Sequence, residues 1–399
     1  MKRIIALAIL LLGFASIGSA QTGTWSGKLE VQGTALSIVF HLDGENPTAD
    51  SPDQGVRGIP IEVERKETGG IVIRIPSLGA SFEGQWLVKQ IVGTFKQLGL
   101  SVPLTLTPGE PKLNRPQTPK GPFPYAQEEV SFANGDAVLQ GTLVLPEGCT
   151  RKTPVLIMVT GSGQQNRDEE IFEHKPFAVI ADAFARAGIA TLRYDDRGVG
   201  GSTGDVVNST TEDFKNDALA GIKLLRERFD KVGVIGHSEG GTIALMLAAE
   251  GQADFIVSLA GVAISGKETL LWQSRLSLEQ AGIPEENIDD YLKAILTQNQ
   301  SPWMQYFLAI DTRPILGRIT CPVLALNGTL DMQVEHEANL GALRAGLPAN
   351  PKTKIEALEG LNHLFQHSKT GIATEYRSIE ETFAPEALEI MIRWLEEQK

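Results

Sequence analysis

The sequence Val232-Gly-Val-Ile-Gly-His-Ser-Glu-Gly-Gly241 predicts a strand that turns sharply into a helix. Val232–Ile235 has the apolar character of a short buried strand, and Gly241–Glu250 carries an apolar face at helical spacing. Between them lies a G-x-S-x-G motif centred on Ser238. Such a turn strains the serine backbone and needs glycine two residues before and after the serine, because side chains there would collide. We therefore expect the Ser238 hydroxyl to project from the sheet in front of the first N–H groups of the helix.

Strands and helices alternate on both sides of this turn, from about residue 125 to residue 399. Strands are expected near 127–133, 137–146, 154–160, 189–194, 232–236, 254–260, 322–327 and 353–358, and helices near 176–187, 210–228, 240–250, 335–346 and 385–397. This alternation indicates a mainly parallel eight-stranded sheet with helices on both faces. The turn signal Asn134-Gly-Asp136 predicts an antiparallel first pair. Residues 265–318 are mostly helical and form a predicted cap above the carboxyl ends of the strands, where parallel sheets bind ligands.

The chain before this region has a different pattern. Residues 21–106 show period-2 alternation of apolar and polar residues, which predicts a small all-β domain of roughly seven strands. Residues 107–124 contain six prolines and form a predicted Pro-rich linker. The β domain shows no catalytic cluster. It could bind a sugar or lipid or help the chain form a homodimer, but a structural role is the simpler interpretation.

Residues 1–20 have the features of a secretory signal peptide. Lys2 and Arg3 precede a short apolar run, and Gly18-Ser-Ala20 is a small-residue cleavage site. We therefore expect an exported protein, periplasmic or secreted from a bacterium, without stable membrane insertion after cleavage. An uncleaved anchor is the alternative, although the apolar run is short for a membrane span.

Composition limits the classes of partner and cofactor that we expect for this protein. A formal net charge of −13 argues against nucleic acid as a partner. Cys149 and Cys321 precede different predicted strands, so we expect two free, buried thiols. Two cysteines without a matching histidine cluster give no metal-site spacing, and we expect neither a metal nor another cofactor.

A serine nucleophile needs a base within hydrogen-bonding reach and an acid that orients this base. His363 follows the last predicted strand in Leu358-Glu-Gly-Leu-Asn-His363, whereas His237 lies inside the turn and should point away from Ser238. Asp331 follows the seventh strand in Asn327-Gly-Thr-Leu-Asp331. Because both residues lie at carboxyl ends of strands, we predict Ser238, Asp331 and His363 as the catalytic residues.

The oxyanion of an acyl-transfer reaction needs two N–H donors. Glu239 N–H, directly after the nucleophile, is one candidate. The other should come from the loop Val159–Glu169, where Ser162 N–H is the first choice and Gly163 the alternative. Gly161-Ser-Gly163 lacks the Gly-Lys-Ser/Thr ending of a phosphate loop.

Two further patterns leave alternatives open. The stretch Tyr194-Asp-Asp-Arg-Gly-Val-Gly-Gly-Ser202 could contact substrate, but we favour an ion-paired turn in which Arg197 and an aspartate brace the loops near Ser238. In the cap, Trp303, Tyr306 and Phe307 form a stripe at helical spacing. Such a stripe belongs more often to a core than to an acyl pocket.

Taken together, these motifs make the chain resemble an α/β-hydrolase of the serine esterase and prolyl-oligopeptidase-like superfamily over about residues 125–399. The motifs are Gly161-Ser-Gly163 with Arg167-Asp-Glu169, Tyr194–Gly198, Gly236–Gly241, Leu326-Asn-Gly with Asp331, and Asn362-His363. The order Ser238, Asp331, His363 is that of the family. Thr160-Gly161 stands where His-Gly is common. The chain is most similar to exported bacterial carboxylesterase-like members with a small β domain in front.

We therefore expect a serine hydrolase that cleaves small carboxylic esters through an acyl-enzyme intermediate. The alternatives are a peptidase or an acyltransferase with the same catalytic residues, and a carbohydrate- or lipid-binding protein that has lost activity. Acyl and alcohol specificity are left open.

Overall fold

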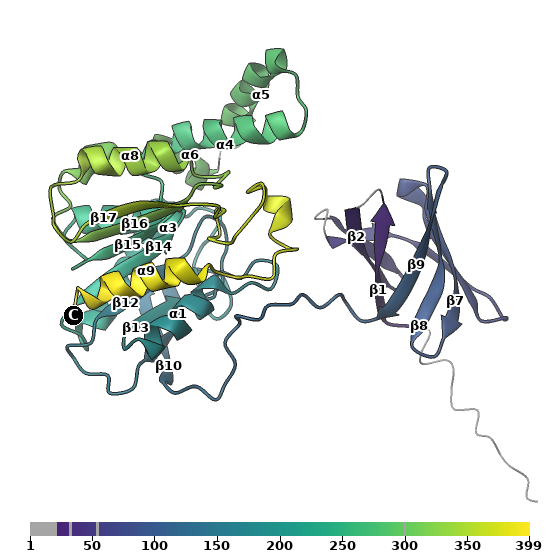
Figure 1. Ribbon diagram of the computed structural model, residues 1–399, viewed down its shortest axis with the longest axis horizontal. Helices are drawn as coiled ribbons and strands as arrows, with labels where there is room; N and C mark the ends of the chain where they lie inside the picture. Colours follow the sequence, from purple (N-terminus) through teal and green to yellow (C-terminus); the bar gives the residue numbers. More distant parts are fainter. Residues whose placement is uncertain (1–21, 32–33, 53–55, 299–300) are drawn as a thin grey trace, which may run out of the picture. The chain divides into compact units, whose positions relative to one another are not determined.

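The computed structural model describes residues 22–31, 34–52, 56–298 and 301–399. Contacts divide the chain into two compact units, with the boundary between Lys112 and Leu113 (Figure 1). The predicted signal peptide, residues 1–20, lies outside the described residues. Within the described ranges, no helix is long and apolar enough to cross a membrane.

The first unit is an antiparallel β structure, as expected. Its described residues form nine strands: β1 (Thr24–Val31), β2 (Thr34–His41), β3 (Thr48–Ser51), β4 (Val56–Pro60), β5 (Glu62–Arg65), β6 (Gly70–Ile75), β7 (Ala80–Leu87), β8 (Gln90–Gln97) and β9 (Leu100–Pro108). The strand order is β4-β3-β2-β1-β9-β8-β7-β6-β5. The edge strands β4 and β5 are separated in the chain only by the buried Ile61, so the sheet curls until its two edges meet. Our estimate of about seven strands was too low, because β3, β4 and β5 are short and largely polar.

Alternating apolar side chains fill the inside of this curled sheet. Phe40, Ile73, Phe82, Ile91 and Leu106 are fully buried there. Trp25 packs edge-on against Trp86, with 5.0 Å between ring centroids. Because side chains occupy the interior, the unit has its own hydrophobic core.

The second unit contains the predicted mainly parallel sheet. In the described residues its eight strands are β10 (Ala126–Asn134), β11 (Ala137–Leu145), β12 (Val155–Val159), β13 (Ala190–Tyr194), β14 (Val232–His237), β15 (Ile256–Leu259), β16 (Val323–Gly328) and β17 (Lys354–Leu358). Their order is β10-β11-β13-β12-β14-β15-β16-β17. β10 and β11 form the expected antiparallel pair, with Asn134 opposite Ala137. From β13 to β17 every neighbouring pair is parallel, which brings the loops after β12, β14, β16 and β17 to one edge of the sheet.

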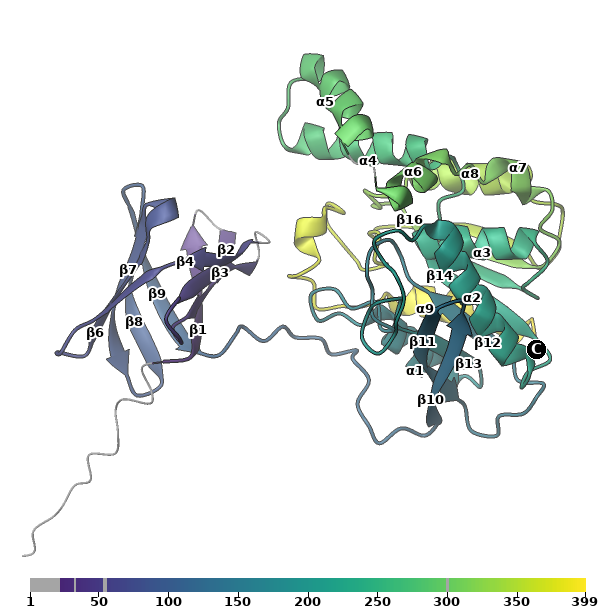
Figure 2. The same cartoon turned by 180° about the vertical axis from the view of Figure 1, so that it is seen from behind.

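Helices cover both faces of this sheet (Figures 1 and 2). One hydrophobic core joins the sheet to α2 (Thr211–Arg226), α3 (Glu239–Ala249) and α8 (His336–Gly346). The other joins it to α1 (Pro176–Arg186) and α9 (Pro385–Glu396). The strands between these two layers are buried on both faces, which explains their continuous apolar character.

The predicted insertion between β15 and β16 is helical. Its described part comprises α4 (Gly266–Gln280), α5 (Glu285–Gln298), α6 (Pro302–Ala309) and α7 (Arg313–Leu316). Ser265 and Glu268 form a capping box at the start of α4. Figure 1 shows α4 and α5 projecting from the sheet, while α6 lies closer to it. This insertion is the cap of the fold.

The second half of the Pro-rich segment is anchored to the second unit. The Arg115 guanidinium is buried and donates hydrogen bonds to the backbone carbonyls of Phe172 (2.9 and 3.0 Å), Arg377 (2.8 Å) and Ile379 (2.7 Å). Gln117 binds the backbone of Phe383 through its side-chain amide. The segment therefore fixes the position of residues 377–383, which lead to α9.

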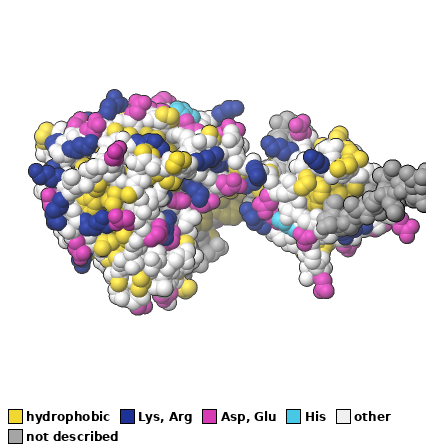
Figure 3. All heavy atoms as spheres, turned by 90° about the horizontal axis from the view of Figure 1, so that it is seen from below, with side chains coloured by type: hydrophobic (Ala, Val, Ile, Leu, Met, Phe, Trp, Pro, Cys, Tyr) yellow, Lys and Arg dark blue, Asp and Glu magenta, His cyan; other side chains and the backbone are white. Residues whose placement is uncertain are grey.

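Cys149 and Cys321, the two cysteines of the chain, are both free. Each is half-buried, whereas we expected buried thiols, because Cys149 lies in the loop between β11 and β12 and Cys321 lies before the start of β16. On the face of the molecule in Figure 3, basic and acidic side chains are interspersed.

Candidate active site

Ser238 lies in the sharp turn between β14 and α3. Its backbone adopts φ 53° and ψ −117°, a left-handed conformation that is strained for a serine. A Cβ on Gly236 would overlap the Gly240 carbonyl, and a Cβ on Gly240 would overlap the Val159 carbonyl at the end of β12. Both glycines of the motif are therefore required by the close approach of backbone to backbone.

Asp331 and His363 follow the neighbouring strands β16 and β17. His363 Nδ1 lies 2.8 Å from Asp331 Oδ2, and both side chains are almost fully buried. The other carboxylate oxygen of Asp331 accepts the backbone N–H groups of Gln333 (2.7 Å) and Val334 (2.9 Å). These two backbone donors fix the orientation of the carboxylate, so one oxygen always faces the imidazole.

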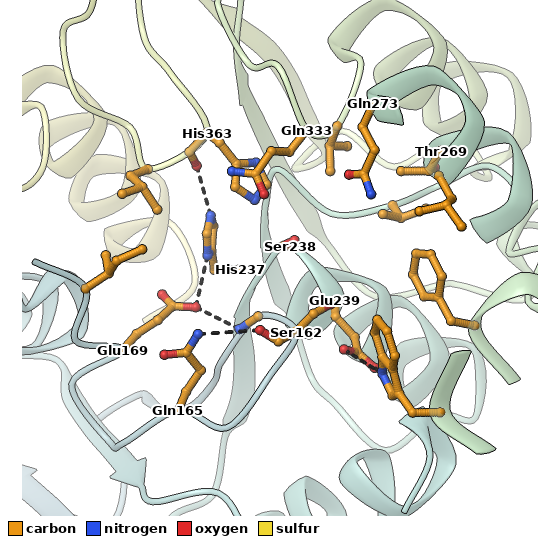
Figure 4. Close-up of a pocket in the computed structure, with 18 of the residues that line it drawn as sticks. Ser162, Gln165, Glu169, His237, Ser238, Glu239, Thr269, Gln273, Gln333 and His363 are labelled. Carbon is orange, nitrogen blue, oxygen red and sulfur yellow. Dashed lines mark hydrogen bonds and ion pairs between the residues drawn. The ribbon is translucent and has the colours of Figure 1, made fainter. Parts of the chain in front are cut away.

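A cavity of about 280 Å³ brings the elements of this site together. Ser238 and His363 both line it (Figure 4). The Ser238 hydroxyl forms no hydrogen bond with any described residue in this structure, which leaves it free to rotate toward a base. Cavity-lining residues come from the loops after β12, β14, β16 and β17 and from the cap helices α4 and α6.

The loop after β12 passes directly in front of Ser238. A Cβ on Gly161 would lie only 3.2 Å from the Ser238 Cβ, so glycine allows this approach. Ser162 and Glu239 line the cavity from the loop and from the first turn of α3. Neither of their backbone N–H groups donates a hydrogen bond to a residue within the described ranges. Gly163 lies next in the loop, with φ 102°, and is not among the cavity-lining residues.

A buried contact between Glu169 and His237 was not anticipated from the sequence. Glu169 Oε1 accepts the Gly161 N–H (2.7 Å) and lies 3.0 Å from His237 Nδ1. His237 Nε2 lies 2.9 Å from the backbone carbonyl of His363, and the two imidazole rings are 4.7 Å apart. Burial lowers the pKa of His237, but the Glu169 carboxylate, the His363 carbonyl and Asp331 together outweigh burial and raise it. His237 is therefore part of the site, although we expected it only to point away from Ser238.

The Asp-Asp-Arg stretch after β13 braces loops, as we favoured. Arg197 forms a buried bidentate pair with Asp217 on α2 (2.7 and 2.6 Å). Asp195 receives a hydrogen bond from Arg167 at 2.8 Å. None of the three residues of the stretch, Asp195 to Arg197, is among the cavity-lining residues.

Asp196 holds the loop in front of Ser238. It accepts hydrogen bonds from the Thr160 hydroxyl (2.8 Å) and the Gln165 N–H (2.9 Å). Burial raises the pKa of Asp196 to about 8, and the nearby Glu169 and Glu239 carboxylates add to this effect. The carboxyl group of Asp196 is consequently protonated through much of the neutral range.

The aromatic stripe of the cap is divided between two roles. Trp303 and Phe307 line the cavity and stack on each other, with ring centroids 5.4 Å apart. Tyr306 instead donates a hydrogen bond to Glu212 on α2 (2.9 Å). The core interpretation is thus wrong for Trp303, and Phe307 serves both as a buried residue and as cavity wall.

The Glu239 carboxylate has a role that its sequence position does not reveal. It is buried and accepts hydrogen bonds from the Trp303 indole N–H (2.9 Å) and the Thr211 hydroxyl (2.6 Å). It therefore fixes the cap helix α6 to the first turn of α3, next to the cavity.

The charges around the cavity limit what it can hold. Its described lining residues include Glu169, Glu239, His237 and His363 but no Lys or Arg. Among the described residues, no group of three or more His, Cys, Asp and Glu side chains is arranged to hold a metal ion. The arrangement offers a serine hydroxyl, an oriented imidazole and unpaired N–H groups around one cavity, which are the parts required for acyl transfer.

Part of this unit is similar to a known hydrolase family. The family described as X-Pro dipeptidyl-peptidase (S15 family) matches residues 134–313. That match contains Ser238 but ends before Asp331 and His363.

Two curated relatives and a solved structure are similar to parts of the chain. The chain is 29% identical to esterase EstD of Thermotoga maritima over 241 residues, 57% of this chain and 58% of the relative. It is 33% identical to an acyl transferase of Photobacterium leiognathi over 116 residues, 28% of this chain and 37% of the relative. The chain thus spans less than two thirds of either relative. The structure of esterase Pf2001 from Pyrococcus furiosus matches 72% of this chain and 98% of its own, with 20% identity and a TM-score of 0.49.

The strand order with its antiparallel first pair, the serine turn between β14 and α3, and the match to an esterase agree with one another. The second unit therefore has the α/β-hydrolase fold, and part of the chain is similar in sequence to an esterase.

Proposed function

We propose that this protein is a serine hydrolase that cleaves carboxylic esters. Ser238 attacks the acyl carbon, and His363 accepts the hydroxyl proton and then delivers it to the leaving alcohol. Asp331 keeps the imidazole in the required tautomer and balances its positive charge. Water then attacks the acyl enzyme, with His363 acting again as the base, and the carboxylic acid leaves.

The single observation that carries this proposal is the buried Asp331–His363 pair beside a strained, unpaired serine. Asp331 Oδ2 accepts the Nδ1 proton of His363, which leaves Nε2 as the proton acceptor. His363 and Ser238 line one cavity, so rotation of the serine hydroxyl can bring it toward this nitrogen. Catalytic hydrogen bonds are often loose before substrate binds and tighten in the complex.

The negative charge of the tetrahedral intermediate needs donors that are already in place. The N–H groups of Ser162 and Glu239 are unpaired among the described residues, and both residues line the same cavity as Ser238. Each such donor contributes roughly 10²- to 10³-fold to turnover. We assign the oxyanion site to these two groups.

The lining of the cavity supports an uncharged small-molecule ester as substrate. Val262, Leu270, Trp303, Met304 and Phe307 form an apolar wall, and no Lys or Arg among the described lining residues would neutralise an anionic group. The similarity to esterase EstD points to the same chemistry.

A peptidase is the second candidate, and the match to the S15 peptidase family favours it. An acyltransferase is a third, because one relative is an acyl transferase. Parallel assays on p-nitrophenyl acetate, on an X-Pro p-nitroanilide, and on the ester with an added alcohol as acyl acceptor separate the three. We expect ester hydrolysis to exceed amide hydrolysis and transfer to the alcohol.

We also propose that the enzyme is exported, either to the periplasm or into the medium, and that it has no nucleic-acid partner. Whether it forms a homodimer is left open. The N-terminal residue of the protein recovered from the periplasm or medium tests export. A chain that begins at Gln21 supports export, and a chain that keeps residues 1–20 and stays with the membrane contradicts it.

Replacement of the nucleophile tests the function. Ser238→Ala should lower kcat on p-nitrophenyl acetate by about 10⁴- to 10⁶-fold, because the covalent route is closed. Ser131→Ala, an exposed serine on β10, is the matched control and should behave as wild type. Equal rates for wild type and Ser238→Ala would contradict the proposal. A wild type that fails to react with a fluorophosphonate would favour a silent binding protein.

A further inference from the structure

The catalytic steps above leave one buried charged pair without a function, Glu169 and His237. Both side chains are almost fully buried, at 6% and 8% exposure. Glu169 also has a left-handed backbone, with φ 51°, which is unfavourable for a glutamate. A buried pair and a strained residue beside a reactive serine indicate a constraint that serves the site.

The contacts of this pair connect the two loops that must act together. Glu169 Oε1 accepts the N–H of Gly161, which precedes the proposed oxyanion donor Ser162. The same oxygen lies 3.0 Å from His237 Nδ1, and His237 Nε2 lies 2.9 Å from the His363 carbonyl. Figure 4 shows His237 between Glu169 and His363, with Ser238 beside it. One bridge thus ties the oxyanion loop to the loop that carries the base.

The acceptors around His237 determine its protonation. A backbone carbonyl only accepts hydrogen bonds, so Nε2 must carry a proton. Glu169 Oε1 already accepts the Gly161 N–H, and we infer that it accepts a proton from Nδ1 as well. His237 is therefore an imidazolium. Its other titratable neighbours are Asp331, which favours this state, and the ring of His363, 4.7 Å away.

We infer that the Glu169–His237 ion pair is a positioning device that sets the oxyanion loop against His363 and switches off at alkaline pH. This inference rests on the proposed function. When hydroxide removes the Nδ1 proton, Nε2 keeps its proton and still donates it to the His363 carbonyl. The exposed lone pair of Nδ1 then faces the Glu169 carboxylate, and the contact between them is lost. The oxyanion loop and the base lose their common anchor.

The direction of the pH effect follows from the raised pKa of His237. The bridge is complete below this pKa and is lost as the pH rises through it. Activity should therefore fall at high pH, where the bridge opens. A serine esterase with only its Ser-His-Asp residues would keep its activity on the alkaline side.

The test is the pH profile of kcat/KM on p-nitrophenyl acetate for the full chain. His237→Gln cannot titrate, so its profile should lose the alkaline fall, at a kcat lowered by roughly 10- to 100-fold through misplacement of the reacting groups. Glu169→Gln should lower kcat similarly. Without the carboxylate His237 is expected to lose its Nδ1 proton, and the one amide atom at this place cannot both accept from Gly161 and donate to Nδ1. His367→Gln is the matched control, since His367 is also paired with glutamates but is half exposed and lies outside the cavity.

A measurement independent of activity completes the test. In protein with ¹⁵N-labelled histidine, the resonance missing from His237→Gln identifies His237, and both its nitrogens should be protonated at neutral pH. A neutral His237, or variants with reduced activity but an unchanged alkaline fall, would overturn the inference. The proposed function fails separately, if wild type and Ser238→Ala hydrolyse the ester equally.

Discussion

The floor and the roof of the cavity are built from different interactions. The floor consists of loops at the carboxyl ends of the strands, where Asp331 holds His363, Glu169 holds His237 and Asp196 holds the Thr160–Gln165 loop. The roof consists of α4 and α6, which offer mainly apolar side chains such as Leu270, Trp303 and Phe307. Buried polar groups with complete partners fix geometry, whereas apolar contacts tolerate changes of shape.

This difference suggests a division of labour. Changes in the floor should alter the rate of the chemical step, because hydrogen bonds there orient reacting atoms. Changes in the roof should alter which acyl groups are accepted. The Glu239 carboxylate is the exception, since it belongs to the floor but holds Trp303 of the roof.

After loss of the nucleophile itself, the largest effect is expected in the floor, for Asp331→Asn. The backbone N–H groups of Gln333 and Val334 will select the amide oxygen, so the amide NH₂ must face His363. The imidazole then carries its proton on Nε2 and cannot accept one from Ser238. We expect kcat to fall by about 10⁴-fold, with little change in thermal stability. Steady-state kinetics and a melting curve measure both, and a kcat within tenfold of wild type would exclude Asp331 as the orienting acid.

A smaller and different effect is expected in the roof, for Trp303→Ala. Removing the indole lengthens the cavity, so kcat/KM for a p-nitrophenyl octanoate relative to the acetate should rise roughly tenfold. Trp303→Phe is the matched control, because it loses the hydrogen bond to Glu239 but keeps most of the volume. If both variants shift the chain-length preference equally, the hydrogen bond and not the wall determines specificity.

The smallest effect concerns stability and falls on Asp196. Its pKa rises from an ordinary 3.8 to about 8 on folding, so the folded state binds more protons than the unfolded state between these values. Unfolding free energy should therefore decrease as the pH rises from 4 to 8. Asp196→Asn can still accept from Gln165 and donate to Thr160, but it cannot titrate.

Calorimetry at pH 5 and pH 9 checks this expectation. The decrease in Tm between the two should be smaller by several degrees in Asp196→Asn than in wild type. Asp230→Asn, at an exposed ion pair with Arg151, is the control and should leave the decrease unchanged. An identical decrease in all three proteins would show that Asp196 is ionised in the folded state.

Local patterns were sufficient to predict most of the fold. The period-2 and period-3.6 patterns located the eight strands and the flanking helices of the second unit, and the glycines around Ser238 located the turn. The short strands β3, β4 and β5 were missed because their pairing depends on neighbours across the sheet and not on their own apolar pattern. Their polar sequences resemble loops.

Residues of the site could be predicted only where their position at the end of a strand is enough to bring them to the site. Asp331 and His363 stand at strand ends, so topology alone brings them to one edge of the sheet. Glu169 and His237 are separated by 68 residues and meet through side chains, which no local pattern reports. The Trp303–Glu239 contact depends likewise on where the cap helix lies. The only sequence signal for these four residues is that each lies in or near one of the motifs discussed under Sequence analysis.

Ser238 should form an acyl enzyme with the help of His363. Intact-protein mass spectrometry after rapid acid quench of a p-nitrophenyl acetate reaction tests this directly. We expect an added acetyl group that peptide mapping places on Ser238 in wild type, and its absence in both Ser238→Ala and His363→Ala. An acetyl group on another residue, or steady turnover by Ser238→Ala, would contradict it.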